Sequence, residues 1–403
     1  MDGPRSARAS EVMEAADLAN RVFRLAAHLG PTMHLEFPRL FCKEHPEQLW
    51  IVREGERVVS LVGAFRRDLY LQGCKTSTAA LGAVCTDPAY RSQGLAGLIL
   101  RSLALHLTQQ GVRVLIISGD RPLYRRMGGV RSGLVHWVTV PASPTPTLAA
   151  AEDRWWVEEV RPEQTERLAE VLRLYEQEPV RFERSLEDLR GFVGALPHGF
   201  DGTRYRRLWL ARQGRSGPAR AYLTTDGPSW PAASPAVDEP IYWQAREWGG
   251  DRAAVWRLAA ELAGGHGVNG IRFPVSSIDR DLLNQARRHG FTVAATDSTA
   301  WASWGGTFVG LNPQGLLGDL QPLLGEELAG HLLTAVTAGR ITPPVLLAIL
   351  FGQEAGWWTG SRAAWLAQLR ELLGMREEER GRVETLASPL PLPWMWGNTL
   401  NYV

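Results

Sequence analysis

The sequence predicts a mixed α/β (α+β) protein of two or three domains, built from mostly antiparallel sheets flanked by helices. Its 403 residues exceed what a single hydrophobic core usually organises. Apolar residues make up 45% of the chain and charged residues 22%, which is ordinary for a globular protein. The order helix, strands, helix, strand occurs twice, and the composition then changes near residue 300 to apolar helices.

The first of these units is expected to cover residues 1–145. Its apolar spacing predicts a helix, an antiparallel meander of three strands, a second helix and a short buried strand. In order, these elements are expected at 10–29, 49–55, 56–73, 77–87, 93–110 and 112–120. The non-periodic segment PASPTPTLAAAED, residues 141–153, marks the boundary to the next unit.

The second unit is expected at residues 146–300 and repeats the same order without obvious sequence repetition. Strand-like and helical patterns alternate in it at 157–177, 207–213, 219–225, 239–248, 251–265 and 270–275. A third, mixed domain is expected at 301–403. Apolar helical patterns there cover 313–325, 326–339, 343–352 and 362–374, and they precede an uncharged, aromatic tail.

Charge and cysteine content narrow the classes of function. The formal net charge is +1 and the charges are interleaved, so the chain lacks the positive field that non-specific nucleic-acid binding needs. The N-terminus lacks the apolar core of a signal peptide, and no run is apolar enough for a membrane span, which predicts a cytoplasmic protein. Cys42, Cys74 and Cys85 are too far apart for a metal site and are expected to be reduced thiols.

The segment from Leu81 to Gly128 carries the chemistry. It reads as a strand ending near Thr86, an Asp-Pro turn, and a helix that begins within Arg91–Ala96. The first amides of a helix have no partner within the helix and lie at the positive end of its dipole, so this turn predicts a site for a pyrophosphate. Gly94 permits a close approach of the backbone, and the Arg91 side chain adds a cation.

The pattern V-x-x-D-P-x-Y-R-x-x-G-L-A, followed by L-Y-x-x-x-G-G, resembles motif A and the next strand of the GNAT acetyltransferase superfamily. The resemblance covers roughly residues 10–140 and implies acetyl-CoA as co-substrate. It implies that the fourth strand contacts the pantetheine arm and that the turn binds the pyrophosphate. The residues so assigned are Val84, Cys85, Thr86, Arg91, Ser92, Gln93, Gly94, Leu95, Ala96 and Gly97.

The catalytic groups are also implied by the resemblance. Tyr124 matches the family's tyrosine, a general acid that gives its proton to the leaving thiolate, and a phenol of pKa about 10 can donate to a thiolate whose thiol has a pKa of about 8.5. Many members carry a glutamate on the strand before motif A, but residues 78–83 contain no carboxylate. A different base is therefore needed to deprotonate the amine.

The order of the three domains resembles the enhanced intracellular survival (Eis) family of acetyltransferases. That resemblance implies a second, degenerate GNAT-like domain, a sterol-carrier-protein-like C-terminal domain and self-association into a homo-oligomer. It also implies that the terminal carboxylate, here on Val403, is the catalytic base. An α-carboxylate has a pKa of about 3.5, so desolvation or a relaying water would have to assist it, and Asp120 or Glu36 are alternatives.

Two classes of function follow. The first is an enzyme that moves an acetyl group from acetyl-CoA to a small-molecule or peptide amine, without metal and without nucleic acid. The second is a non-catalytic protein that binds acyl-CoA or carries an apolar ligand in its C-terminal domain. The chain contains sixteen tryptophans. Most are expected in cores and domain interfaces, and the sequence does not indicate which of them line a pocket for a cationic amine.

Overall fold

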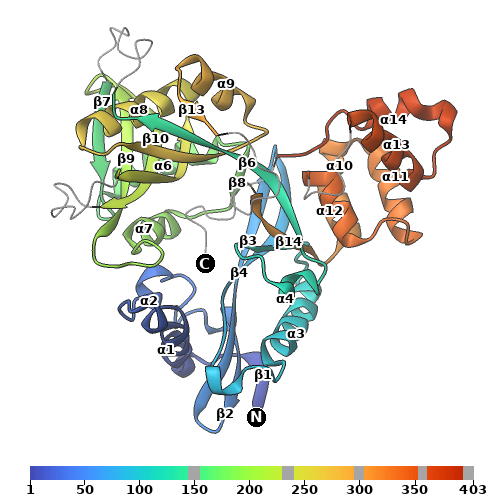
Figure 1. The fold of residues 1–403 in the computed structure, drawn as a ribbon, viewed down its shortest axis with the longest axis horizontal. Coiled ribbons are helices and arrows are strands. Elements are labelled where there is room, and N and C mark those ends of the chain that lie inside the picture. The colour runs from blue at the N-terminus through green and yellow to red at the C-terminus, as the bar shows by residue number, and fades with distance from the viewer. Residues whose placement is uncertain (144–154, 229–239, 295–303, 353–360, 394–403) are drawn as a thin grey trace.

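The computed structural model describes residues 1–143, 155–228, 240–294, 304–352 and 361–393. From α1 to β5 the first unit follows the expected order of elements, but it begins with an unexpected strand, β1, that pairs with β2. Its bounds are β1 (Asp2–Ser6), α1 (Val12–Phe23), α2 (Met33–Glu36), β2 (Leu49–Glu54), β3 (Arg57–Leu71), β4 (Cys74–Thr86), α3 (Leu95–Gln109), β5 (Val114–Ile117), α4 (Pro122–Arg125) and β6 (Val130–Pro141). Helices α1 and α3 lie on opposite sides of the β3–β4 hairpin (Figure 1).

The second unit repeats this order. Its elements are β7 (Trp155–Val160), α6 (Thr165–Glu176), β8 (Val180–Phe182), α7 (Leu186–Gly194), β9 (Arg204–Gln213), β10 (Ala219–Pro228), β11 (Tyr242–Gly250), α8 (Arg252–Gly265), β12 (Gly270–Ser276), α9 (Arg280–Arg288) and β13 (Thr292–Val293). In both units an antiparallel run of strands leads into a parallel pair, β4 with β5 and β11 with β12. The pairs are joined by α3 and α8, because parallel neighbours need a crossover connection.

One sheet runs through both units. Its order is β1-β2-β3-β4-β5-β14-β6-β12-β11-β10-β9-β7, where β14 is Trp304–Gly310. Each unit therefore completes its sheet with a strand from the other part of the chain. Strand β14 lies between β5 and β6, and β6 continues past it to pair with β12 of the second unit. No helix among the described residues is long and apolar enough to cross a membrane.

The position of β14 corrects the expected organisation. Residues 304–310 were expected to open the third domain, yet all four residues from Thr307 to Gly310 pair with β5. Strand β5 pairs with β4 along one edge. Without β14, the N–H and C=O groups of its other edge would be buried and unpaired. The apolar segment around Phe308 supplies the hydrogen-bond partners for this edge, and Phe308 itself has no exposed surface.

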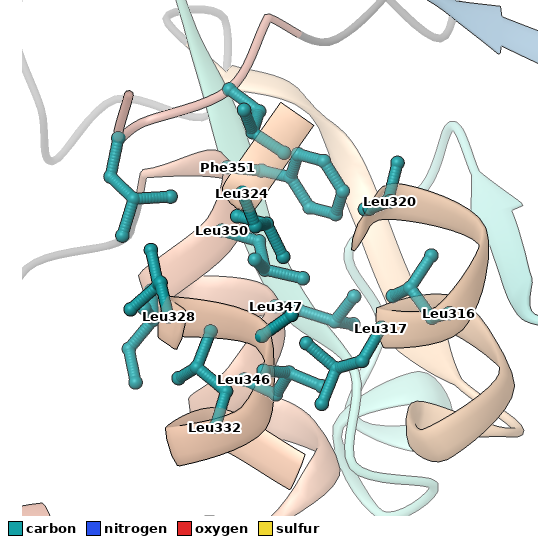
Figure 2. Packing of buried hydrophobic residues seen from close by; sticks show 14 of the residues in the cluster. Leu316, Leu317, Leu320, Leu324, Leu328, Leu332, Leu346, Leu347, Leu350 and Phe351 are labelled. Carbon is teal, nitrogen blue, oxygen red and sulfur yellow. The ribbon is translucent and has the colours of Figure 1, made fainter. Parts of the chain in front are cut away.

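The described part of the C-terminal region is helical where a sterol-carrier-like α+β domain is expected. The described residues after Gly310 form helices and no strand: α10 (Pro313–Leu324), α11 (Glu326–Thr337), α12 (Pro343–Phe351), α13 (Arg362–Leu373) and α14 (Arg380–Leu386). Figure 2 shows leucines of α10, α11 and α12 pointing toward one another. Their core continues onto β14 and the tip of the β3–β4 hairpin, through Phe308, Leu69 and Leu71. These helices cover one end of the first unit's sheet.

We expect Phe308→Ala to lower the free energy of unfolding by about 3–5 kcal/mol, because it removes a ring from a core that spans the sheet and the helices. Urea or thermal unfolding followed by circular dichroism measures this. The matched control is Leu333→Ala on α11, whose side chain is 42% exposed. Equal, small effects of both substitutions would contradict the placement of β14 in the core.

Candidate active site

The candidate site is the fork where β4 and β5 separate. The two strands are paired from Thr78 to Leu81 on β4, and the last partner of β4 on β5 is Ile117. Strand β4 continues for five more residues to Thr86. The side of this stretch that faces away from β3 therefore has no strand partner, which leaves backbone donors and acceptors for a ligand.

A bulge in β4 shapes the fork. The register with β3 shifts between Gly63 and Leu61, and Ala83 adopts a left-handed backbone with φ of 51°. An extra residue of this kind bends a strand and re-aims the groups that follow it. Beyond the bulge, the Ser60 hydroxyl donates a hydrogen bond to the carbonyl of Cys85 at 3.2 Å. It is also hydrogen-bonded to the Thr86 hydroxyl at 2.9 Å.

Cys85 offers only its backbone to this site. Its side chain is 5% exposed and packs in the core that includes α1. Burial raises the pKa of the Cys85 thiol to about 12, so it is neutral at physiological pH. The neighbouring residue Val84 points to the opposite face of β4 from Cys85. It lies there in a second core, together with Leu95 and Tyr124.

The turn after β4 is the segment for which the sequence predicts an anion site. Asp87 fixes its start, because its carboxylate accepts the amide N–H of Ala89 at 3.1 Å and a guanidinium N–H of Arg57 at 3.2 Å. Ser92 and Gly94 both have left-handed backbones, with φ of 64° and 76°. Helix α3 then begins at Leu95 without a side-chain cap.

The amides of this turn are available to a ligand. Among the described residues, no backbone or side-chain group accepts a hydrogen bond from the amides of Ser92 through Gly97. Successive amides around left-handed residues at a helix start form a concave anion-binding nest. Cations lie close by, since Arg91 reaches the carbonyl of Thr86 at 3.5 Å and Arg21 lies 3.8 Å from Asp87.

Tyr124 lies beyond the end of β5, in the short helix α4, and is 5% exposed. Strand β14 supports its turn from the other side, because the Thr307 hydroxyl donates to the carbonyl of Gly119 at 2.8 Å. A Cβ on Gly129 would lie 2.7 Å from the Tyr124 carbonyl and 2.9 Å from Thr307. The turn therefore depends on glycine at 129 and on Thr307, which is 188 residues from Gly119 in the sequence. Sequence reasoning missed both contacts.

The two carboxylates considered as alternative bases, Glu36 and Asp120, both accept hydrogen bonds from arginines. Glu36 is buried and accepts hydrogen bonds from Arg24, from the Thr32 hydroxyl at 2.6 Å and from the Gly199 amide at 2.7 Å. Burial alone would raise the pKa of Glu36, but these partners together hold it below its usual value. Asp120 accepts two hydrogen bonds from Arg125, at 3.1 and 2.8 Å. Val403 lies outside the described residues.

The second unit has the same fork without the anion site. Strands β11 and β12 stay paired only up to Gln244, and β11 shifts register on β10 immediately afterwards. Here, however, α8 begins two residues after β11 ends, and its N-terminus is capped by Asp251. The carboxylate of Glu178 accepts from the Gly250 amide at 2.8 Å and from Arg252 at 2.9 and 2.8 Å. A protein anion thus occupies the end of this fork.

Comparisons with known proteins agree with this geometry. Residues 4–129 match the model of the acetyltransferase (GNAT) domain, a stretch that contains the fork, the turn before α3 and Tyr124. This match supports acyl transfer as the reaction class. A search of curated protein sequences found no match.

Solved structures share the fold at low sequence identity. A GCN5-related N-acetyltransferase from Anabaena variabilis is 13% identical with a TM-score of 0.56, covering 78% of this chain and 74% of that one. A probable N-acyltransferase from Enterococcus faecalis is 15% identical with a TM-score of 0.57, covering 78% and 73%. Eis1 from Mycobacterium abscessus is 14% identical with a TM-score of 0.50, covering 78% and 75%. These likenesses show that the tandem, mostly antiparallel fold is a known one.

Gly94 and Gly97 allow a matched test of the turn. Gly94→Ala should destabilise the protein by about 1–2 kcal/mol, because a Cβ is strained at φ of 76° even though no atom lies within 4 Å of it. Gly97→Ala lies in the first turn of α3 and should be neutral or stabilising by up to about 1 kcal/mol. Urea unfolding of both variants gives the two signs, and a stabilising Gly94→Ala would refute the left-handed turn.

Proposed function

We propose that the chain is an N-acetyltransferase that moves an acetyl group from acetyl-CoA to a primary amine. The observation that carries this proposal is the row of free amides from Ser92 to Gly97 at the mouth of a strand fork, within a matched acetyltransferase domain. The amides suit a diphosphate, and the open side of residues 82–86 suits the amide groups of a pantetheine arm. Acetyl-CoA supplies the activated acetyl group when bound.

Tyr124 is proposed as the general acid. Two observations support this role: Tyr124 lies in α4, shortly after β5 ends, and it belongs to the same hydrophobic core as Val84 of β4 and Leu95 of α3. When the amine nitrogen bonds to the acetyl carbon and the carbon–sulfur bond breaks, the departing sulfur takes the phenolic proton. A phenol of ordinary pKa about 10 can protonate a thiolate whose thiol has a pKa of about 8.5.

The carboxylate of Val403 is proposed as the group that removes the amine proton, directly or through a water. Two observations favour a base other than a carboxylate of β4, Glu36 or Asp120. Residues 78–83 of β4 contain no carboxylate, and both Glu36 and Asp120 are bound to arginines. The pairing of Glu36 with Arg24 helps to hold the pKa of this carboxyl below its usual value, which makes Glu36 a poor proton acceptor. Arg125 donates hydrogen bonds to both carboxylate oxygens of Asp120.

The second unit is proposed to shape the acceptor side rather than to bind a second coenzyme. Its fork has no long turn between β11 and α8. Instead, the Glu178 carboxylate accepts a hydrogen bond from the Gly250 amide at the end of β11. Polar contacts join the two units near α2, where Glu36 accepts the amide N–H of Gly199. An amine acceptor entering between the units would reach the fork from this side.

The main experiment is a thiol-release assay with acetyl-CoA against polyamines, aminoglycosides and lysine peptides. An acetyltransferase gives CoA release that depends on the amine, with a mass increase of one acetyl group on the product. Gly94→Val should weaken acetyl-CoA binding in calorimetry, and the control Gly111→Val, at a left-handed glycine with φ of 83° beyond the other end of α3, should not. Binding of acetyl-CoA without turnover on any amine would favour the rival hypothesis of a binding or carrier protein.

We expect Tyr124→Phe to lower kcat roughly 10²-fold with acetyl-CoA affinity retained, since phenylalanine keeps the packed ring and lacks the hydroxyl that carries the proton. Steady-state kinetics and calorimetry measure the two quantities. Tyr205→Phe is the control, because Tyr205 is 41% exposed and its hydroxyl donates to Gly202. Unchanged turnover in Tyr124→Phe would reject the role of the phenol.

Extending the chain by a few residues beyond Val403 should depress kcat strongly, because it moves the carboxylate and replaces it with a neutral amide. The same residues added before Met1 serve as the control, since the N-terminal ammonium lies at the far end of β1 beside Glu54, at 3.4 Å. Acetyl-CoA affinity should survive both extensions. Full turnover with the C-terminal extension would rule out the terminal carboxylate as base.

A further inference from the structure

The fork of the second unit contains a cavity of about 380 Å³. Strands β11 and β12 pair only as far as Gln244 and Arg272, and the cavity lies beyond this point. From the two strands it is lined by Arg246, Glu247, Trp248, Pro274 and Ser276. The corresponding place in the first unit is the open stretch of β4 beyond Leu81, so this cavity is separate from the candidate active site.

The backbone of Trp248 points into this cavity. Successive residues of a strand direct their N–H and C=O groups to alternate edges. Just after β11, the amide of Asp251 donates toward β10, to the Arg220 carbonyl at 2.9 Å. The amide of the preceding residue, Gly250, donates to the other side, to Glu178 at 2.8 Å. Trp248 lies two residues before Gly250 and so faces that side too. No described strand pairs with it there, and no other described group bonds to its N–H or C=O.

Pro274 faces the same space from β12. Odd-numbered residues of this strand face β6, since the amide of Ser277, directly after β12, donates to the Leu134 carbonyl at 2.8 Å. Pro274 therefore faces the fork. Proline has no N–H, so its place beside an unpaired edge leaves no donor unsatisfied, while its carbonyl stays available. The cavity thus offers a donor and an acceptor on β11 and a further acceptor on β12.

Apolar and aromatic side chains form much of the cavity wall. Tyr175 and Tyr222 line it, and their hydroxyls are already used, in donating to the Phe182 carbonyl at 3.0 Å and to Glu247 at 3.2 Å. Ile278 lines it from the loop after β12. A volume of this size suits a small, extended organic ligand whose body packs on apolar groups.

The charged groups around the cavity balance one another. Arg252 lies between two carboxylates, with Glu178 at 2.8 Å and Asp279 at 3.2 Å. Conversely, the carboxylate of Asp226 lies between two guanidinium groups, with Arg206 at 2.9 Å and Arg246 at 2.7 Å. The other charged lining residues also come in opposite signs: Glu247 is paired with the buried Arg184, and Arg280 and Asp281 are exposed neighbours. The cavity as a whole therefore favours an uncharged ligand.

Glu178 closes the cavity to a phosphate. Its carboxylate accepts the Gly250 amide at the end of β11, which corresponds to the place where the first unit leaves amides free. The start of α8 is also satisfied, because the Asp251 carboxylate accepts the amide of Ala254. A phosphate at this end would find no free amides and would be repelled by the carboxylates.

We propose that this cavity binds an uncharged chain with secondary amides, the chemistry of a pantetheine arm without its phosphates. One amide of the ligand would exchange hydrogen bonds with the N–H and C=O of Trp248, and the methylene groups would pack on Tyr222 and Ile278. The site goes beyond the acetyl transfer proposed for the first fork and does not depend on it. A capped, uncharged peptide carries the same amide chemistry, and the experiment separates these two sources.

The probe is S-methylpantetheine, titrated into the full chain by isothermal calorimetry with and without saturating acetyl-CoA. We expect one site per chain under both conditions, with an affinity that changes little with salt, because the ligand is uncharged. The 4′-phosphorylated form of the probe should bind at least tenfold more weakly. So should a probe with both amide nitrogens methylated, since methylation removes the donors and leaves the charge unchanged.

Variants locate the site. Ile278→Trp should fill the cavity and weaken binding of the probe tenfold or more, whereas Leu105→Trp, on a side chain of α3 that is 68% exposed, should not. Thermal unfolding checks that both variants are folded. Tyr124→Phe should bind the probe normally, so failure of acetyl transfer and failure of this site are distinguishable.

A second variant tests the exclusion of phosphate without filling the cavity. Glu178→Gln keeps an oxygen acceptor for the Gly250 amide and removes the negative charge. It should strengthen binding of the phosphorylated probe several-fold and leave binding of S-methylpantetheine unchanged. Glu187→Gln is the control, because this carboxylate on α7 is 78% exposed and does not line the cavity.

Several outcomes would overturn the proposal. These are no binding of S-methylpantetheine, equal affinity for its phosphorylated form, a folded Ile278→Trp variant that binds like the parent, or competition with acetyl-CoA, which would place the probe in the first fork. The capped dipeptide N-acetyl-valyl-glycine methylamide tests the other source of amides. If it bound more tightly than S-methylpantetheine, the cavity would be assigned to a peptide and the pantetheine-type ligand would be refuted.

Discussion

The need to pair the backbone of β5 is the constraint on which the rest of this structure depends. Strand β5 is short and wholly buried, and its first edge is used by β4. Its second edge is completed by β14, which arrives from beyond the second unit and whose Thr307 supports the turn that carries Tyr124. Folding of the candidate site is thereby tied to the chain from residue 304 onward, although the motif itself ends near residue 129.

The two units show how one architecture can keep or lose an anion site. Both have a parallel pair that separates and a register shift just after the last paired residue. The first unit has eight residues between its strand and its helix, and the left-handed residues in that segment leave amides free. The second unit has one residue there, and it satisfies the helix end with Asp251. The number of residues at this single connection decides which fork suits a diphosphate.

Arginine–carboxylate pairs hold the units together and also restrict the chemistry. Arg24 with Glu36 and Arg67 with Asp188 are buried or partly buried, and each cluster joins a residue of the first unit to the second. Breaking such a pair leaves a buried charge without a partner and costs several kcal/mol, so these contacts fix the relative position of the units. For the same reason Glu36 is a structural residue rather than a proton acceptor.

The sequence by itself determined the local features. Apolar periodicity predicts α1, β2 to β5 and α3, and glycine at 94 indicates the turn before α3, because helix starts and turns depend on neighbouring residues. Only the tertiary structure decided what pairs with β5, why residues 304–310 belong to the first sheet, and that the described residues after Gly310 are helical. Those outcomes depend on edges and cores formed by segments far apart in the chain, and a local pattern carries no information about which distant strand completes an edge.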